Sequence, residues 1–166
     1  MALFVRLAGA HDEAMNPQPT SAPGPVVVGV DGSANSIEAL KMAMHEAQWR
    51  SVPVKAIISW QYPSSYGIEG MSFAMTDPGL EDEARAVLAN AVAQACPDDA
   101  DRSTIEQVAT FGAPSKVLID ASDGASLLVV GARGHGGFMG LLMGSSSTQV
   151  VHHAHCPVLI VPQPDR

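Results

Sequence analysis

The sequence predicts an α/β fold in which an open, five-stranded parallel sheet has helices on both faces. Two observations support this prediction. Short runs rich in valine, isoleucine and leucine alternate with longer segments whose apolar residues recur at helical spacing. The apolar runs are continuous rather than alternating, which is typical of strands buried on both faces. A strand that is followed by a helix and then another strand runs parallel to its neighbour.

The first strand is predicted over 26–30, where the run VVVGV is followed by the turn residues Asp31, Gly32 and Ser33. Val52-Pro53 ends the helix that follows, because proline cannot continue it. The segment 61–78 has no clear period and is predicted to be a loop. Strands are expected over 26–30, 54–60, 105–111, 127–131 and 157–161.

Four helices fill the segments between these strands. Asn35 and Glu38 resemble a capping box at the start of the first helix, which extends to about Arg50. Pro114 is expected at the start of the third helix, and Gly124 is expected to stop it. The four helices are predicted over about 35–50, 78–95, 114–123 and 145–154.

Length and composition favour one domain over 26–162, preceded by a flexible, proline-containing leader over 1–25 and followed by a short tail over 163–166. Nine basic residues against seventeen acidic ones give a net charge of −8, which argues against nucleic acid or an anionic membrane as a partner. No apolar run is long enough to span a bilayer, and Arg6 interrupts the only apolar run near the start. Two cysteines cannot build a disulfide framework, so we expect a cytoplasmic protein.

The segment 131–147, GARGHGGFMGLLMGSSS, is the most informative one for function. Glycines let backbone amides approach a ligand, and the start of a helix offers unpaired N–H groups that bind phosphate. Ser145, Ser146 and Ser147 add hydroxyl groups there, and Arg133 and His135 add positive charge. No acidic residue occurs between Asp123 and Asp165. The segment therefore predicts a site for an anionic ligand rather than an ordinary glycine loop.

Two well-known phosphate-binding motifs are absent. A P-loop requires a lysine after its glycines, and this loop contains none. A dinucleotide fingerprint requires G-x-G-x-x-G after the first strand, where this chain has GVDGSA. The glycines follow the fourth predicted strand instead.

Other candidate sites are weaker. His152, His153, His155 and Cys156 lie close together in the sequence, but their spacing matches no zinc motif. We therefore expect histidines near a helix C-terminus, where positive charge is favourable, and a small buried cysteine rather than a nucleophile. A hydrolase built on Ser145 and His135 lacks the G-x-S-x-G elbow.

The motif Gly131-x-x-Gly134, followed after nine residues by Gly144-Ser145, resembles the G-2x-G-9x-G-S signature of the ATP-binding universal stress proteins. The segments VVVGVDGS at 26–33 and LLMGSSSTQVVHHAHCPVLIV at 141–161 are similar to the two ends of that family, and the resemblance covers about 26–162. Ser146 departs from it, since the family often has valine there.

The resemblance implies a Rossmann-like fold, ATP in a cleft and a homodimer paired through the last strand. Asp31 would bond adenine or ribose, although an Asx-turn or helix cap is its alternative role. Asp31 is also a candidate ligand for Mg²⁺ beside the phosphates. The implied nucleotide-binding residues are Gly29, Asp31, Ser59, Val130, Gly131, Gly134, Gly144, Ser145, Ser146 and Ser147, and the loop residues Arg133 and His135 join them.

Three function classes follow. A nucleotide-dependent regulatory protein of the stress response is the favoured one. A slow ATPase or nucleotidyl transferase is less favoured, because fast phosphoryl transfer needs a cation clamp and a positioned base that the loop lacks. A nucleotide-free interaction module is the third class, and the intact glycine signature argues against it. The downstream protein partner is not indicated by the sequence.

Overall fold

The computed structural model describes residues 3–5, 23–62, 78–98, 102–134 and 143–163. All five predicted strands and all four predicted helices are present, with ends within about three residues of those expected. The elements are β1 (Leu3–Val5), β2 (Val26–Gly29), α1 (Ala34–Arg50), β3 (Val54–Trp60), α2 (Pro78–Ala95), β4 (Ile105–Phe111), α4 (Pro114–Ala121), β5 (Leu127–Gly131), α5 (Ser145–His153) and β6 (Val158–Val161). None of the helices in these ranges combines the length and apolarity that a membrane span requires.

The strands form one sheet in the order β1-β6-β5-β2-β3-β4. Strands β2 to β6 are parallel, as predicted, and β1 is antiparallel to β6. The short strand β1 lies within the segment 1–25 that was predicted to be a flexible leader. From β2 the chain builds β3 and β4 on one side and then returns to build β5 and β6 on the other. Strand order therefore reverses between β2 and β5, where ligands bind in such sheets.

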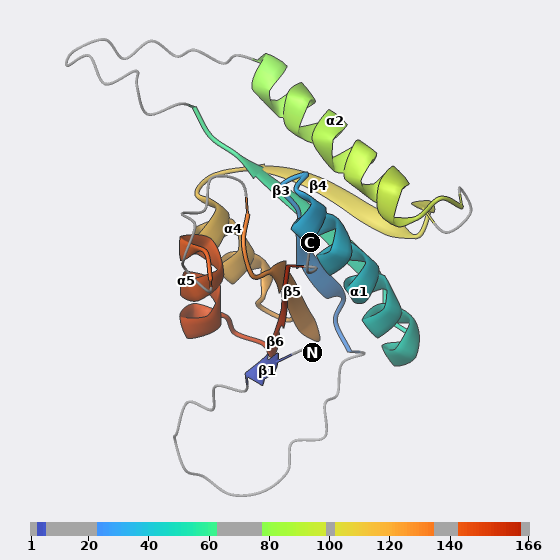
Figure 1. Ribbon diagram of the computed structural model, residues 1–166, viewed down its shortest axis with the longest axis vertical. Helices are drawn as coiled ribbons and strands as arrows, with labels where there is room; N and C mark the ends of the chain where they lie inside the picture. Colours follow the sequence, from blue (N-terminus) through green and yellow to red (C-terminus); the bar gives the residue numbers. More distant parts are fainter. Residues whose placement is uncertain (1–2, 6–22, 63–77, 99–101, 135–142, 164–166) are drawn as a thin grey trace, which may run out of the picture.

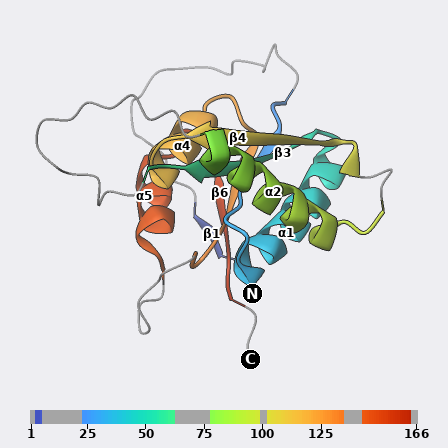
Figure 2. The ribbon, with the colours of Figure 1, turned by 90° about the horizontal axis from the view of Figure 1, so that it is seen from above.

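Helices cover both faces of the sheet (Figure 1), with α1 and α2 on one side and α4 and α5 on the other (Figure 2). Successive strand residues point to opposite faces, so each strand contributes to two cores. Leu127 packs with α1 and α2 residues such as Leu40 and Leu88. Leu128 packs with Val117 of α4 and Val150 of α5.

The start of α1 differs from the capping box predicted at Asn35 and Glu38. The helix begins at Ala34, and Ser33 is its N-cap, with extended backbone angles and an Oγ that accepts from the Ser36 N–H at 3.2 Å. Serine is as good a cap as asparagine, and Ser33 occupies the position where the chain leaves the turn. Asn35 is instead the second helical residue and is 4% exposed.

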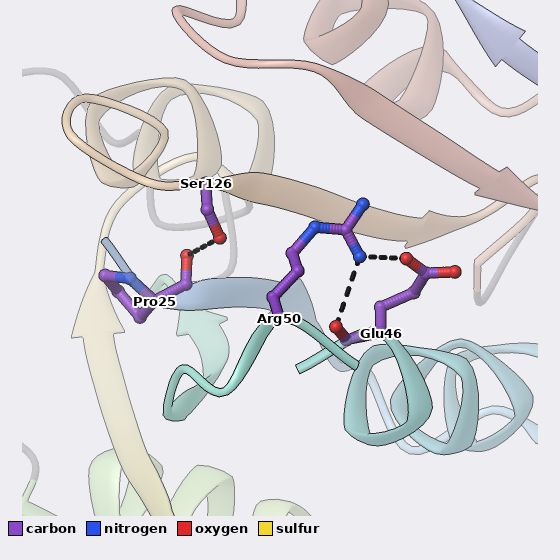
Figure 3. A network of polar contacts seen from close by, with 4 residues as sticks. All are labelled: Pro25, Glu46, Arg50 and Ser126. Carbon is purple, nitrogen blue, oxygen red and sulfur yellow. Dashed lines mark hydrogen bonds and ion pairs between the residues drawn. The ribbon is translucent and has the colours of Figure 1, made fainter. Parts of the chain in front are cut away.

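The amino ends of β2 and β5 are joined by backbone and side-chain bonds. Both the N–H and the Oγ of Ser126 donate to the Pro25 carbonyl, at 3.0 and 3.2 Å (Figure 3). Nearby, Arg50 in the last turn of α1 donates to the Glu46 carbonyl at 3.1 Å and pairs with the Glu46 carboxylate. The Ser126–Pro25 bonds hold the end of the sheet opposite to the one where the glycine loop, residues 131–147, begins, and the Arg50–Glu46 contacts hold the last turn of α1.

Candidate functional site

A cleft of about 480 Å³ opens at the carboxyl ends of β2 and β5, where strand order reverses. Its volume falls within the range of small-ligand sites. The structure brings eleven of the twelve predicted site residues to its walls, and the twelfth, His135, lies outside the described residues. The eleven are Gly29, Asp31, Ser59, Val130, Gly131, Arg133, Gly134, Gly144, Ser145, Ser146 and Ser147.

One wall of the cleft is apolar. Ile57, Val130 and Leu118 line it and are 3%, 4% and 8% exposed, so their side chains are held by the core behind them. Gly29 completes this wall, because a Cβ there would lie 2.8 Å from Cδ1 of Leu118. A flat aromatic ring is the kind of group that such a surface accommodates.

The opposite wall is polar and is built around the N-terminus of α5. Gly144 is the N-cap of this helix, and it has no side chain to satisfy the first N–H groups. Those groups, with the positive end of the helix dipole, favour a negatively charged ligand. Ser145 is exposed and Ser146 is half-buried, so both hydroxyl groups are accessible from the cleft.

Ser147 differs from its two neighbours. It is 7% exposed, and its Oγ donates to the carbonyl of Gly131 at 2.8 Å. This bond joins the first turn of α5 to the end of β5. Its hydroxyl is thus already used inside the protein, and its backbone N–H is the group that it presents at the helix start.

The position of Asp31 suits both of the roles considered for it, the Asx-turn before α1 and contact with a ligand in the cleft. Its Oδ1 accepts from the N–H and Oγ of Ser33, at 3.0 and 2.6 Å, which is an Asx-turn before α1. Its Oδ2 faces the glycine loop, since a Cβ on Gly134 would lie 2.5 Å from it. One carboxylate oxygen therefore shapes the turn, and the other lies at the cleft.

Asn35 is a residue whose role sequence reasoning missed. Its Nδ2 donates to the carbonyl of Arg133 at 2.9 Å, across 98 positions of sequence. Gly131 passes so close that a Cβ there would lie 2.7 Å from the same Nδ2. Asn35 therefore holds the start of the glycine loop against α1. The near-complete burial of the Asn35 side chain indicates that it holds the loop. One sequence alone does not show that a polar residue in the first turn of a helix is buried.

We predict that Asn35→Ala increases the rate of tryptic cleavage after Arg133 by about tenfold. Losing one hydrogen bond to a partly buried carbonyl costs about 1–1.5 kcal/mol, and local opening becomes more frequent in proportion. Mass spectrometry of the fragments ending at Arg133 measures the rate. Ser36→Ala is the control, because the Ser36 hydroxyl bonds only the neighbouring Ser33 carbonyl, at 2.9 Å. Equal cleavage rates in the two variants would contradict the role of Asn35.

The histidine and cysteine residues near the end of α5 do not form a cluster of metal ligands. Within the described part of the chain, no group of three or more histidine, cysteine, aspartate or glutamate side chains is placed to hold a metal ion. His152 and His153 are exposed, with ring centroids 6.4 Å apart. Cys156 is half-buried, and desolvation raises the pKa of its thiol to about 11, partly offset by a backbone hydrogen bond from Leu128.

A second prediction concerns the reactivity of Cys156. Because its pKa is raised from 9.0 to about 11, its thiolate fraction at pH 8 is about a hundredfold lower than that of an ordinary thiol. Iodoacetamide should therefore alkylate Cys156 slowly at pH 8 and much faster as the pH rises through 10 to 11. Peptide mass spectrometry measures the rate, with the urea-unfolded chain as the reference. A rate at pH 8 equal to that of the unfolded chain would be the contrary result.

The family model described as "Universal stress protein family" matches residues 24–162. Universal stress protein Rv2005c of Mycobacterium tuberculosis is 34% identical over 169 residues, covering 96% of this chain and 54% of the relative. Universal stress protein Rv2623 of the same organism is 35% identical over 154 residues, covering 90% of this chain and 48% of the relative. The chain thus spans about half the length of the curated relatives that it matches.

Solved structures agree with this match. The crystal structure of a universal stress protein in complex with cAMP is 29% identical, with a TM-score of 0.61, and covers 85% of this chain and 98% of that one. A universal stress protein from Archaeoglobus fulgidus is 26% identical, with a TM-score of 0.62, and covers 83% and 98%. UspA from Lactobacillus plantarum is 22% identical, with a TM-score of 0.63, and covers 86% of this chain and 99% of that one. This likeness supports the fold alone. On its sequence, its sheet order and its relatives, this chain belongs to the universal stress protein family.

Proposed function

We propose that the cleft binds ATP and that the bound nucleotide regulates the protein in a stress response. The observation that carries this proposal is the division of one cleft into an apolar wall and a wall of uncapped backbone amides. A nucleotide has the same two halves, a flat apolar base and a charged phosphate chain. The solved relative in complex with cAMP, at 29% identity, supports a nucleoside phosphate as the ligand class.

In the proposed complex the base lies on the wall formed by Ile57, Leu118 and Val130, and Gly29 leaves room for it beside Ser59. The phosphates lie at the start of α5, where amides after Gly144 and the accessible serine hydroxyls donate to them. Gly131 and Gly134 let the loop backbone come close without side chains in the way. Arg133 lines the cleft, and among the described residues its guanidinium has no acidic partner, so it is available to a phosphate.

Asp31 has two roles in the proposal, which one measurement separates. Its Oδ2 can accept from ribose hydroxyls, or it can hold Mg²⁺ through bound waters, since Mg²⁺ commonly takes one or two carboxylates. The donor set fits either role, because Oδ2 of Asp31 lies at the cleft beside Gly134. Asp31→Asn should weaken ATP binding equally with Mg²⁺ and with EDTA if the oxygen contacts ribose. The loss should be confined to Mg²⁺ buffers if it serves the ion.

We propose a regulatory protein rather than an enzyme. Fast phosphoryl transfer needs a cation clamp, bound metal and a positioned base. The charged residues among the described walls of the cleft are Asp31 and Arg133, and the loop contains no lysine. Asp31 already accepts two bonds from Ser33, which lowers its fitness as a base. We therefore expect ATP hydrolysis to be slow or absent.

The proposal extends to the partners. We propose a cytoplasmic homodimer that pairs through the last strand, β6, with the downstream protein unidentified. The net charge of −8 disfavours nucleic acid and anionic membranes as partners. The segment 131–147 includes the first turn of α5, and α5 leads to β6, so nucleotide binding and pairing act on adjoining segments.

The test is to purify the protein without added nucleotide, denature it and identify any released nucleotide by chromatography. Nucleotide-stripped protein is then titrated calorimetrically with ATP, with adenosine and with inorganic triphosphate, each with and without Mg²⁺, while phosphate release is followed. We expect ATP to bind more tightly than either half of the molecule, with little release of phosphate. Absence of both retained nucleotide and titratable binding would favour the nucleotide-free interaction module. Rapid phosphate release would favour the ATPase.

A further inference from the structure

The sheet edge beside β6 is occupied by a strand from the far end of the chain. Strand β1 pairs antiparallel with β6, with Leu3 opposite Ile160, Phe4 opposite Leu159 and Val5 opposite Val158. Among the described residues near the start of the chain, three pair with β6, so the contact that the structure shows is short. An unpaired strand edge is a template on which another strand forms hydrogen bonds, and β1 covers that edge here.

The ladder between β5 and β6 determines which backbone groups of β6 face β1. The N–H groups of Leu128 and Ala132 donate to the carbonyls of Pro157 and Val161, at 2.9 and 2.7 Å. In a parallel ladder the residues that bond one neighbour alternate with those that face the other side. Val158 and Ile160 therefore point their N–H and C=O groups away from β5 and toward β1.

The same alternation assigns the bonds of β1. Leu3 and Val5, opposite Ile160 and Val158, form the hydrogen-bonded pairs, and Phe4, opposite Leu159, forms the non-bonded pair. The N–H of Phe4 therefore points away from the sheet. Leu3 and Val5, two positions apart on β1, therefore satisfy the outward-pointing backbone groups of Ile160 and Val158, which are two positions apart on β6.

Two β6 strands from two copies of the chain can pair by the same alternation of hydrogen-bonded residues. When they run antiparallel with Leu159 opposite Leu159, Val158 of each strand faces Ile160 of the other. These four residues all point their N–H and C=O groups toward the partner strand. The sequence VLIV carries no charge, and no acidic residue occurs between Asp123 and Asp165. Two copies of a chain with a net charge of −8 can therefore approach here without placing carboxylates opposite one another.

We propose that β1 is an internal cap on the β6 edge and that its displacement lets a second copy of this chain pair there. The inference rests on the proposed homodimer and adds the element that controls it. The cap belongs to the same chain as β6, so its pairing is intramolecular. Covalent linkage gives effective concentrations on the order of millimolar, which exceed micromolar protein, so the cap outcompetes a second copy. Its few bonds make it displaceable.

The test uses full-length variants that remove single N–H groups from the cap. The Leu3→Pro/Val5→Pro double variant removes both donors that face β6, whereas Phe4→Pro removes a donor that faces away and is the matched control. Sedimentation equilibrium between 1 and 200 µM, a range chosen around the micromolar concentrations at which the tether dominates, measures the dimer dissociation constant. Hydrogen exchange reports on the amides of Val158 and Ile160. Circular dichroism and ATP titration establish that each variant is folded.

We expect the wild-type chain and Phe4→Pro to dimerise only weakly, with the Val158 and Ile160 amides of the monomer protected by β1. The double variant should dimerise at least tenfold more tightly, with the same amides protected by the second copy. A wild-type dimer of the same strength as the double variant would overturn the cap and leave the homodimer standing. A monomeric double variant with unprotected amides would overturn the homodimer. A monomeric double variant whose Val158 and Ile160 amides stay protected would overturn the assignment of bonds to Leu3 and Val5. A Phe4→Pro variant that dimerises as tightly as the double variant would overturn it too.

Discussion

Gly144→Asp is expected to weaken ATP binding by about a hundredfold while leaving the fold intact. A carboxylate at the helix start lies about 5 Å from bound phosphate charge, where repulsion amounts to about 3 kcal/mol at the effective dielectric of a protein surface. The folded chain has room for the side chain. Gly144 has a φ of −74°, and a Cβ there would meet its nearest neighbour, the carbonyl of Ala132, at 3.8 Å.

Gly144→Asn is the matched control, because asparagine has the size of aspartate without its charge. The asparagine variant should lose much less affinity for ATP, and both variants should bind adenosine as the wild type does. Calorimetric titration measures all of these affinities. ATP affinity unchanged in the aspartate variant, with a normal unfolding transition, would place the phosphates elsewhere.

Leu128→Ala is expected to lower the free energy of unfolding by about 3 kcal/mol. Leu128 is fully buried in β5 among the side chains of α4 and α5. Its truncation removes apolar contacts and leaves a cavity that the surrounding strands cannot collapse. That loss is a large fraction of the 5–15 kcal/mol typical of a domain. Urea denaturation followed by circular dichroism measures it.

Trp49→Ala removes a larger apolar side chain and provides the comparison. Trp49 is 83% exposed on α1, so its truncation should change the free energy of unfolding by less than about 0.5 kcal/mol. Comparing the unfolding free energies of the two variants separates the effect of burial from the effect of side-chain size. Similar losses in the two variants would mean that Leu128 is not held in a close-packed core.

The elements of the fold were predictable because each has a local signal. The valine run of β2 and the apolar run of β5 are continuous, as strands buried on both faces must be. Pro78 and Pro114 begin their helices as expected from the fixed φ of proline. These signals depend on the residues themselves and not on what they pack against.

The features that were missed depend on distant segments. Strand β1 has only three residues, too few for a period, and its partner β6 is more than 150 positions away. Ser33 and Asn35 are both good caps, and the turn after β2 decides between them. Leu118 has the apolar character of a buried helix face, but that pattern cannot show that α4 lies beside Gly29. The glycine loop was found because its signal, spacing of glycines before a helix, is local.

The reversal of strand order has a consequence for when the cleft comes into being. The apolar wall uses residues from Gly29 to Val130, and the polar wall needs Gly144 to Ser147, so the first and last parts of the cleft are synthesised more than a hundred residues apart. Strand β5 is itself supported by β6, which is made later still. A growing chain therefore cannot hold the ligand until its sheet is nearly complete. A ligand that binds only the finished cleft stabilises completed chains and not partial ones.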